Sequence, residues 1–209
     1  MNRCVIIGGG PYTDSNKLAC IIEPEDTIVA ADAGWRLAMA MGVHPALVVA
    51  DFDSMSVPSI SDDVRVITLP VKKDDTDTAV AMREGYQTGH RSFLLLGCTG
   101  GRLDHFQAAL TTAAQYAVKD CDVTIADEYN VIHVLKPGRY TFPIVPGSYV
   151  SMFAFGEQVD ALSAEGLEYE INQFSLSPMN PLCVSNSAKG DFFTVQFESG
   201  ILLLYLSQD

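Results

Sequence analysis

The chain of 209 residues is 48% hydrophobic and 19% charged, so it has enough apolar material for a packed core and too little charge for a disordered chain. Its 26 acids against 13 lysines and arginines give a formal net charge of -13. Because that charge repels phosphate backbones and anionic lipids, neither nucleic acid nor a membrane is expected as a partner.

The cysteine and histidine spacing argues against disulfides and zinc. Cys4, Cys20, Cys98, Cys121 and Cys183 form no CxxC pair, and no histidines stand at zinc-ligand spacing. The N-terminal segment lacks the long apolar stretch of a signal peptide, and no run of 18 apolar residues predicts a membrane span. We therefore expect reduced thiols, a cytoplasmic location and, for any metal, the carboxylate ligands that Mg²⁺ prefers.

The first part of the chain alternates apolar strands with helical patterns. Continuous apolar runs predict strands at residues 4–7, 27–31, 47–50, 65–69, 92–96 and 122–126. Helical periodicity predicts helices at residues 15–22, 35–41, 76–88 and 103–118. Strands that alternate with helices are typical of a mostly parallel sheet, so residues 1–128 are expected to form an α/β domain.

After Pro137-Gly138 the pattern changes to short strands separated by turns. Strands are predicted at residues 140–144, 149–155, 158–164, 167–171, 182–185, 192–197 and 201–206, with glycine or proline between many of them. This density of short strands is typical of an antiparallel sandwich. We therefore predict a small all-β sandwich domain at residues 129–209.

Glycines and charged side chains follow five of the predicted parallel strands in turn. They are Gly8-Gly9-Gly10, Asp32-Ala33-Gly34, Asp51-Phe52-Asp53-Ser54, Lys73-Asp74-Asp75-Thr76-Asp77 and residues 97–105. Because ligands of open parallel sheets bind at the carboxyl ends of the strands, we expect these motifs to line one site.

Several motifs also have a structural alternative. The glycines suit either a phosphate-binding turn or a plain tight turn, and Asp32 suits either a ribose contact or a helix cap. Asp51 and Asp53 stand at i and i+2 and need a cation to remain ionised side by side, unless they form a solvated turn. Thr76 is expected to cap a helix, whereas Asp77, among neighbouring acids, indicates a metal.

The loop before the helix predicted at residues 103–118 favours anion binding. Backbone N–H groups and the guanidinium of Arg102 suit a phosphate, while Asp104 either caps the helix or faces a metal. His105 is interpreted as a helix-start contact, and Cys98 lacks the paired base that a catalytic thiol needs. Without a Walker A pattern, the residues favour Mg²⁺–nucleotide chemistry, with phosphoryl or pyrophosphoryl transfer as the best fit.

At these motifs the chain resembles the thiamine pyrophosphokinase (thiamine diphosphokinase) family over nearly its whole length. The matching segments are Ala31-Asp32-Ala33-Gly34, residues 42–54 with Asp51-Phe52-Asp53-Ser54, Lys73-Asp74-Asp75-Thr76-Asp77, residues 97–105, and Val184-Ser185-Asn186. They are similar to the family patterns A-D-G-G, G-x-x-P-D-x-x-x-G-D-F-D-S, K-D-x-T-D, G-x-x-G-G-R-x-D-H and S-N. Ala33, Ala46 and Ala50 depart from those patterns.

The resemblance implies transfer of the terminal pyrophosphate of ATP to the hydroxyl of thiamine, with release of AMP. It implies an ATP-binding catalytic domain, a thiamine-binding sandwich, and a homodimer with thiamine near the subunit interface. It implies Asp51, Asp53 and Asp77 as Mg²⁺ ligands, and these three acids with Arg102 and Asp104 as the catalytic set. ATP contacts would come from Asp32, Gly34, Lys73, Thr76, Gly100, Gly101 and Arg102, and thiamine contacts from Ser185 and Asn186.

Two alternatives stay open at this point. One is a pyrophosphokinase for another small alcohol, such as a pterin, and the other is a non-catalytic sensor of thiamine or a nucleotide. The acids at the strand ends argue against a sensor, and Ser185-Asn186 favours thiamine. Tyr169, Phe174 and Tyr205 are candidates for stacking on thiamine, although core packing is the preferred interpretation of each.

Overall fold

The structure is a computed structural model that describes residues 2–50, 64–70 and 74–209, and it divides into two compact units. The first unit comprises Met1–Ala113 and Ile125–Glu128, and the second comprises Ala114–Thr124 and Tyr129–Asp209. Helix α4 (Leu103–Ala117) and strand β6 (Asp122–Ala126) contribute to both. The domain boundary expected after residue 128 stays a prediction. In the described part of the chain, no helix is long and apolar enough to cross a bilayer.

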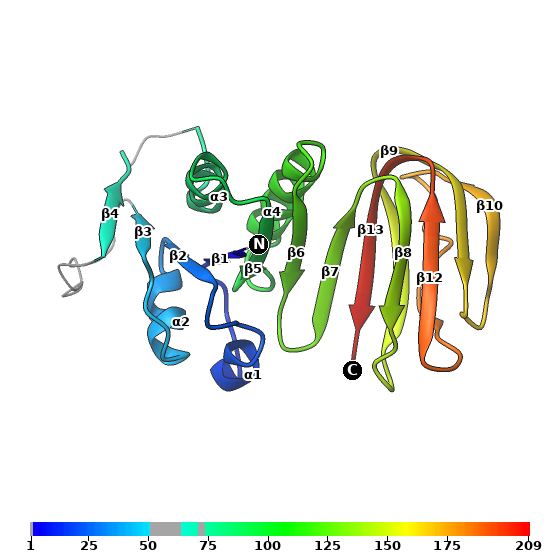
Figure 1. Cartoon of the computed structure of the whole chain (residues 1–209), viewed down its shortest axis with the longest axis horizontal. Coiled ribbons are helices and arrows are strands. Elements are labelled where there is room, and N and C mark those ends of the chain that lie inside the picture. Colours follow the sequence, from blue (N-terminus) through cyan, green and yellow to red (C-terminus); the bar gives the residue numbers. More distant parts are fainter. Residues whose placement is uncertain (1, 51–63, 71–73) are drawn as a thin grey trace. The chain divides into compact units, whose positions relative to one another are not determined.

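The first unit contains a parallel sheet in the order β4-β3-β2-β1-β5 (Figure 1). Its strands are β1 (Cys4–Ile7), β2 (Thr27–Ala31), β3 (Leu47–Ala50), β4 (Arg65–Thr68) and β5 (Ser92–Leu96). All but β4 are almost wholly buried, as expected for parallel strands covered on both faces. Because β2 to β4 extend the sheet on one side of β1 and β5 lies on the other, the strand order reverses between β1 and β5.

The helices of this unit cover both faces of the sheet. They are α1 (Ser15–Ala19), α2 (Gly34–Ala40) and α3 (Asp77–Gln87). The connection through α2 runs from β2 to β3, and the connection through α3 runs in the opposite direction along the sheet, from β4 to β5. Right-handed crossovers in opposite directions place their helices on opposite faces of a sheet, and Figure 1 shows α2 and α3 on opposite sides of β1 and β2. Leu37 of α2 and Met82 of α3 are fully buried. The α/β fold class predicted for this half is confirmed, with element ends within a few residues of the prediction.

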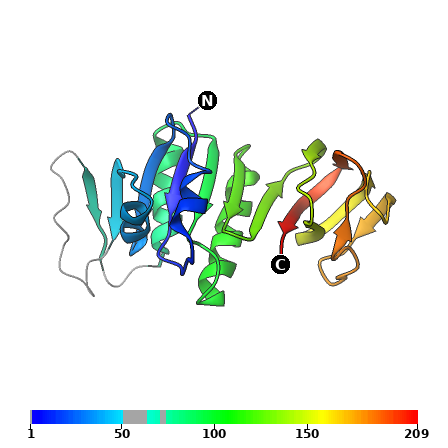
Figure 2. The ribbon, with the colours of Figure 1, turned by 90° about the horizontal axis from the view of Figure 1, so that it is seen from below.

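The second unit is antiparallel throughout, as predicted, and forms two layers that share one long strand (Figures 1 and 2). Its strands are β7 (Asn130–Leu135), β8 (Gly138–Pro143), β9 (Tyr149–Glu165), β10 (Ile171–Leu176), β11 (Asn186–Ser187), β12 (Phe192–Phe197) and β13 (Ser199–Ser207). The first half of β9 pairs with β13 and β11, and its second half pairs with β10 and β12. Buried side chains such as Phe193, Phe197 and Leu204 form the core.

Four strand predictions in this unit were wrong. The two strands predicted at residues 149–155 and 158–164 are one strand, because Gly156, at φ 77°, lets the chain bend while it continues. The segment predicted at 167–171 forms only an isolated bridge at Leu167, and β10 begins at its last residue. The strand predicted at 182–185 is replaced by β11, because Ser185 adopts φ 57° and interrupts extended pairing.

Strand β7 was not predicted at all. Its sequence carries His133 in the middle of an apolar run and lies where the pattern changes from the first part of the chain to the second. The imidazole is accommodated because Phe142 lies beside it, with ring centroids 4.9 Å apart. Burial lowers the pKa of His133, so the ring is neutral at physiological pH and compatible with a strand interior.

Candidate functional site

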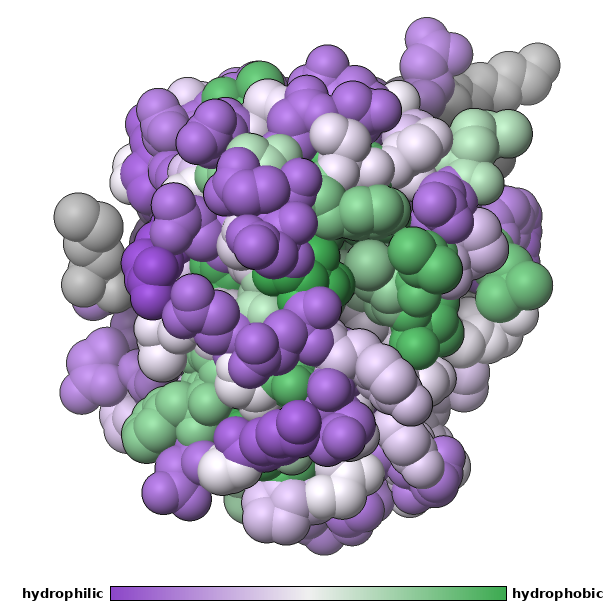
Figure 3. Space-filling model, turned by 90° about the vertical axis from the view of Figure 1, so that its right-hand side faces the viewer, coloured by the Kyte–Doolittle hydropathy of each residue, from purple (hydrophilic) through white to green (hydrophobic). Residues whose placement is uncertain are grey.

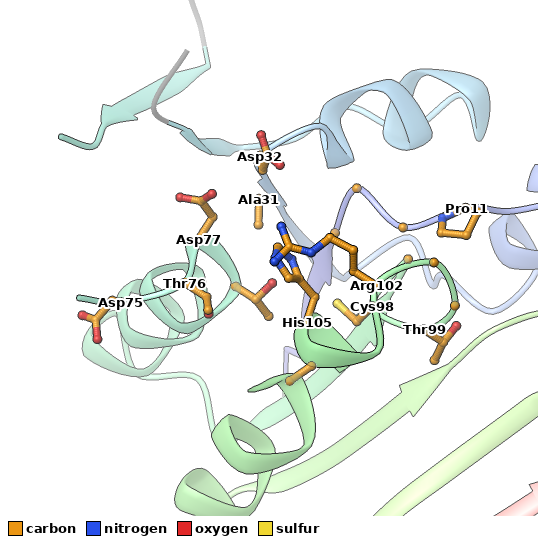
Figure 4. A pocket seen from close by; sticks show the side chains of 18 residues that line it. Pro11, Ala31, Asp32, Asp75, Thr76, Asp77, Cys98, Thr99, Arg102 and His105 are labelled. Carbon is orange, nitrogen blue, oxygen red and sulfur yellow. The ribbon is translucent and has the colours of Figure 1, made fainter. Parts of the chain in front are cut away.

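A cavity of about 650 Å³ opens at the carboxyl ends of β1 and β5, where the strand order reverses (Figure 4). Ligands of open parallel sheets bind at this kind of place. The loops after β1, β2 and β5 and the first turns of α3 and α4 supply most of the lining. The lining residues are Gly8, Gly9, Gly10, Pro11, Ala31, Asp32, Asp75, Thr76, Asp77, Thr78, Gly97, Cys98, Thr99, Gly100, Gly101, Arg102, His105 and Ala109.

Residues 8–11, here called the glycine wall, form one side of the cavity. The backbone N–H of Gly8 donates to the Leu96 carbonyl and that of Gly10 donates to the Gly97 carbonyl, each at 2.7 Å. A Cβ on Gly8 or Gly10 would lie 2.7 or 2.6 Å from the Gly97 carbonyl oxygen. Only glycine therefore permits the loops after β1 and β5 to pack this closely.

Gly100 and Gly101 supply the opposite loop. Both have positive φ, at 73° and 56°, in the region that glycine adopts without steric cost. Pro11 packs against them, since a Cβ on either glycine would lie 3.1 or 3.2 Å from its ring. The loop ends at Arg102, directly before α4, where backbone N–H groups at a helix start favour an anion.

Of the two motif residues after β2, Asp32 lines the cavity and Gly34 does not. Asp32 adopts φ 50° after β2, and its side chain projects into the cavity (Figure 4). Gly34 begins α2 behind the lining, where a Cβ would lie 1.8 Å from the Ile7 carbonyl oxygen. The sequence motif therefore combines a cavity carboxylate with a glycine that lets α2 approach β1.

The acids at the start of α3 are divided between the cavity and the surface. Thr76 caps the helix, since its hydroxyl accepts a hydrogen bond from the Ala79 N–H at 3.2 Å. Asp77 is the first helical residue and projects into the cavity (Figure 4). Asp75 lies at the rim, where its carboxylate pairs with the guanidinium of Arg83. Asp77 thus carries the charge of this motif that faces a ligand.

Arg102 and Asp104 form an exposed ion pair at the mouth of the cavity. Arg102 Nε donates to one Asp104 carboxylate oxygen at 3.1 Å and its Nη2 donates to the other. The hydrogen bonds from Arg102 lower the pKa of Asp104 from its ordinary value. Arg102 lines the cavity, whereas Asp104 does not belong to the lining. A phosphate that binds Arg102 would take the place of this carboxylate.

His105 was interpreted from sequence as a helix-start contact, and the structure places it in the cavity lining (Figure 4). Its side chain is exposed and comes from the first turn of α4, three residues after Arg102. Residues at i and i+3 lie on the same face of a helix, so this spacing was the available signal. Thr78, on the first turn of α3, also lines the cavity without having been identified from sequence.

Asp51, Asp53 and Lys73 lie outside the described residues. In the described part of the chain, no three histidine, cysteine or acidic side chains come close enough to hold a metal by themselves. The described carboxylates in the cavity lining are those of Asp32, Asp75 and Asp77, and Asp75 is paired with Arg83. The chemistry of the Asp32 and Asp77 carboxylates suits Mg²⁺ with its remaining water and phosphate ligands.

Ser185 and Asn186 belong to the second unit and play unequal structural roles. Asn186 is 6% exposed, and its side-chain oxygen accepts hydrogen bonds from the N–H groups of Tyr169 and Ser187. Its side-chain nitrogen donates to the Tyr169 carbonyl at 2.7 Å. Ser185 is exposed, and its N–H donates to the Ser151 hydroxyl at 3.0 Å. Asn186 therefore orders the backbone around an exposed Ser185.

The three aromatic candidates are placed differently from one another. Tyr169 is 73% exposed, so its interpretation as a core residue was wrong. Phe174 packs against the core, and Tyr205 meets Phe153 edge to face at 5.5 Å. Met179 is also largely exposed in this unit, whose hydrophobic surface groups are visible in Figure 3.

Cys98 lines the cavity but is a poor nucleophile. Burial raises the pKa of Cys98 to about 11, and hydrogen bonds with Thr78 and Gly8 offset only part of this rise. At neutral pH the group is therefore a thiol rather than the reactive thiolate. We expect iodoacetamide at pH 7.5 to label the exposed Cys20 well before Cys98, as followed by peptide mass mapping. Equal labelling of the two would contradict this description of Cys98.

Comparisons with known proteins agree across both units. Residues 18–125 match the family described as thiamin pyrophosphokinase, catalytic domain, and residues 130–202 match thiamin pyrophosphokinase, vitamin B1 binding domain. A thiamine pyrophosphokinase of Bacillus subtilis (strain 168) is 25% identical over 216 residues, covering 100% of both chains. The crystal structure of a thiamin pyrophosphokinase from Geobacillus thermodenitrificans is 29% identical, with a TM-score of 0.85 over 99% of this chain and 98% of that one. A Bacillus subtilis thiamine pyrophosphokinase structure shares the fold, with a TM-score of 0.90 over 100% of both chains at 24% identity.

Proposed function

The chain belongs to the thiamin pyrophosphokinase family of ATP-dependent pyrophosphotransferases, and from this premise we propose how its residues carry out the transfer. In the proposed reaction, the hydroxyl oxygen of thiamine bonds to the β-phosphorus of ATP. The bond from that phosphorus to the α–β bridging oxygen breaks, so the products are thiamine diphosphate and AMP. Residues 1–128 are proposed as the ATP-binding catalytic domain and residues 129–209 as the thiamine-binding domain.

The observation that carries the proposal is that the described strand-end motifs, those after β1, β2, β4 and β5, converge on one cavity at the strand-order reversal. The glycine wall and the loop with Gly100 and Gly101 let phosphates approach the backbone closely. Arg102 provides a planar guanidinium, and Asp32 and Asp77 provide carboxylates that suit a metal. A nucleoside triphosphate with its metal carries the complementary charges, since its phosphates suit the guanidinium and its metal suits the carboxylates.

The chain's own groups would act mainly by position and charge. Arg102 exchanges the Asp104 carboxylate for a phosphate oxygen and, with Lys73 and the N–H groups of Gly100 and Gly101, neutralises charge that develops on the β-phosphoryl group and on AMP. Thr76 holds the start of α3 so that Asp77 faces the phosphates. An aspartate of the site accepts the hydroxyl proton of thiamine late in the transfer.

The metal ligands are proposed to be Asp51, Asp53 and Asp77. Mg²⁺, when bound there, supplies charge neutralisation and orientation for the phosphates of ATP. The cavity-facing carboxylate of Asp77 supports this assignment, and Asp32 is a further oxygen donor toward the nucleotide or a metal-bound water.

Thiamine is proposed to bind beside Ser185 and Asn186. The exposed hydroxyl of Ser185 is available for a direct contact, whereas the side chain of Asn186 is already engaged by backbone groups and would hold that contact in place. The net charge of -13 favours a thiazolium cation over anionic competitors.

A homodimer in the cytoplasm completes the proposal. In the part of the chain that the structure describes, none of the five cysteines forms a disulfide, which supports a reducing compartment. The dimer is supported by the family resemblance and is checked by light scattering of the purified protein.

The decisive experiment is incubation of the purified protein with thiamine, ATP and Mg²⁺, with AMP and thiamine diphosphate quantified by chromatography. We expect the two products in equal amounts and loss of both when EDTA removes the metal. Thiamine monophosphate with ADP would contradict pyrophosphoryl transfer. Turnover of a pterin alcohol in place of thiamine would identify the other pyrophosphokinase, and tight thiamine binding without product would identify a sensor.

A further inference from the structure

Glu128 follows the end of β6 and lies outside the cavity lining, yet it is tied to the chain segment that continues the glycine wall. We infer that Glu128 is a positioning residue for ATP, because its carboxylate holds Thr13 and Asp14 and thereby fixes the glycine wall in place. The inference rests on the proposed function, since it takes the cavity to be the nucleotide site.

A single carboxylate oxygen makes the contacts. Oε1 of Glu128 accepts hydrogen bonds from the Thr13 N–H, from the Asp14 N–H at 2.9 Å and from the Thr13 hydroxyl at 3.3 Å. These residues all belong to the first unit, although Glu128 and Asp14 are 114 positions apart in sequence. Hydrogen bonds to an ionised acceptor are stronger than those between neutral groups, so this contact is a firm anchor.

The ionisation of Glu128 agrees with an anchoring role. Desolvation by burial acts to raise the pKa of Glu128, but the hydrogen bonds from Asp14 and Thr13 outweigh it and hold the pKa below its ordinary value. The carboxylate is therefore charged at neutral pH, in the state that binds these donors most strongly.

The anchor reaches the cavity through a short stretch of chain. Only Tyr12 separates Thr13 from Pro11, which packs against Gly100 and Gly101 on the far loop. At the other end of the glycine wall, Gly8 is held by the hydrogen bond from its N–H to the Leu96 carbonyl. Contacts thus hold the glycine wall at both of its ends. Glu128 supplies the contact on the side of Thr13, which is the side that does not continue into β1.

Glycine-rich backbone has many accessible conformations, so a wall released at Thr13 would sample shapes that do not match the phosphates. The loss would fall on ATP binding, because the wall lines the cavity and the proposed thiamine contacts lie in the second unit. A purely structural role would instead lower thermal stability without distinguishing the two substrates.

The test compares Glu128→Ala, Glu128→Gln and the control Glu25→Ala. Glu25 is an exposed glutamate of the same unit, so its variant matches the change in charge and side-chain size. For Glu128→Ala we expect the KM for ATP and the Kd for ATP with Mg²⁺ to rise about tenfold. A rise of this size corresponds to the free energy of roughly one charged hydrogen bond. The KM for thiamine and kcat should stay within about twofold, since interactions made equally in ground and transition states change KM alone. Glu128→Gln, which keeps an acceptor oxygen without the charge, should lie between wild type and Glu128→Ala.

Hydrogen exchange provides a readout besides turnover. The Thr13 and Asp14 amides should exchange faster in Glu128→Ala than in wild type or Glu25→Ala, because they lose their acceptor. If Glu128→Ala folds poorly, the same measurements on Glu128→Gln decide, with an expected rise of about threefold in the Kd for ATP.

Three results would overturn the inference. Unchanged ATP affinity with faster exchange at Thr13 and Asp14 would show an anchor without effect on the nucleotide, while the proposed function stands. Absence of ATP binding to the wild-type protein would overturn the proposed function and this inference together, whereas equal losses for ATP and thiamine would show a general defect.

Discussion

Replacing Asp77 by asparagine is expected to lower kcat by about 10³-fold, since a metal ligand at a phosphoryl group supplies several kcal/mol of transition-state stabilisation. The carboxylate projects into the cavity from the first position of α3, and asparagine keeps its shape while removing its charge. The hydroxyl of Thr76 still caps the helix, so the fold is not altered. Loss of an acid in the first helical turn costs only about 0.3–1 kcal/mol, a shift of a few degrees in Tm.

Kinetics with increasing Mg²⁺ test this assignment, with Asp75→Asn as the matched control. The Asp75→Asn substitution is the same chemical change two positions before Asp77. The Asp75 carboxylate, however, pairs with Arg83 at the rim of the cavity. We expect Asp75→Asn to keep kcat within about threefold, because exposed ion pairs contribute little. If the Asp77→Asn enzyme keeps native kcat and an unchanged Mg²⁺ requirement, Asp77 is not a ligand of the metal.

Replacing Arg102 by lysine is expected to lower kcat by about 10²-fold, although the charge is kept. The guanidinium engages both oxygens of Asp104 in the structure, and this two-point geometry is the one that a phosphoryl group requires. A lysine ammonium is a point charge and cannot reproduce it. Because Arg102 is exposed, Tm should be unaffected.

Steady-state kinetics against ATP, with Arg91→Lys as the control, check this prediction. Arg91 is an exposed arginine that lies over the Tyr86 ring at 4.0 Å and is not part of the cavity lining. Its replacement should leave kcat unchanged. Native kcat for Arg102→Lys would mean that charge alone is needed at this position.

The sequence predicted the α/β half well for a physical reason. Parallel strands buried on both faces appear as continuous apolar runs, and the residues after them bear the charges of the site. The strand ends therefore predicted that Asp32, Asp77 and Arg102 lie near one another, and the structure places all three in the lining of one cavity.

Contacts between distant residues could not be predicted in this way. The sequence left Asp104 either as a helix cap or facing a metal, whereas its carboxylate pairs with Arg102. The amide of Asn186 is engaged by Tyr169, and the carboxylate of Glu128 by Thr13, in both cases across a long stretch of chain. No periodicity records such pairs, because they depend on how the backbone returns in space. Strand β7 pairs along its whole length with β13, which lies near the end of the chain, so the residues around it in sequence gave no sign of this pairing.

The pairing of β9 determines when the second unit can form during synthesis. β9 needs partners between residues 171 and 207, and β7 needs β13, so the layer that contains β7 and the first half of β9 is not complete until β13 has left the ribosome. Such non-local pairing is slow, whereas the first unit closes its sheet with residues up to 128. The nascent chain therefore carries a folded first unit while much of the second unit is still unstructured. Loss of β13 by premature termination would leave both β7 and the first half of β9 without the strand that lies between them.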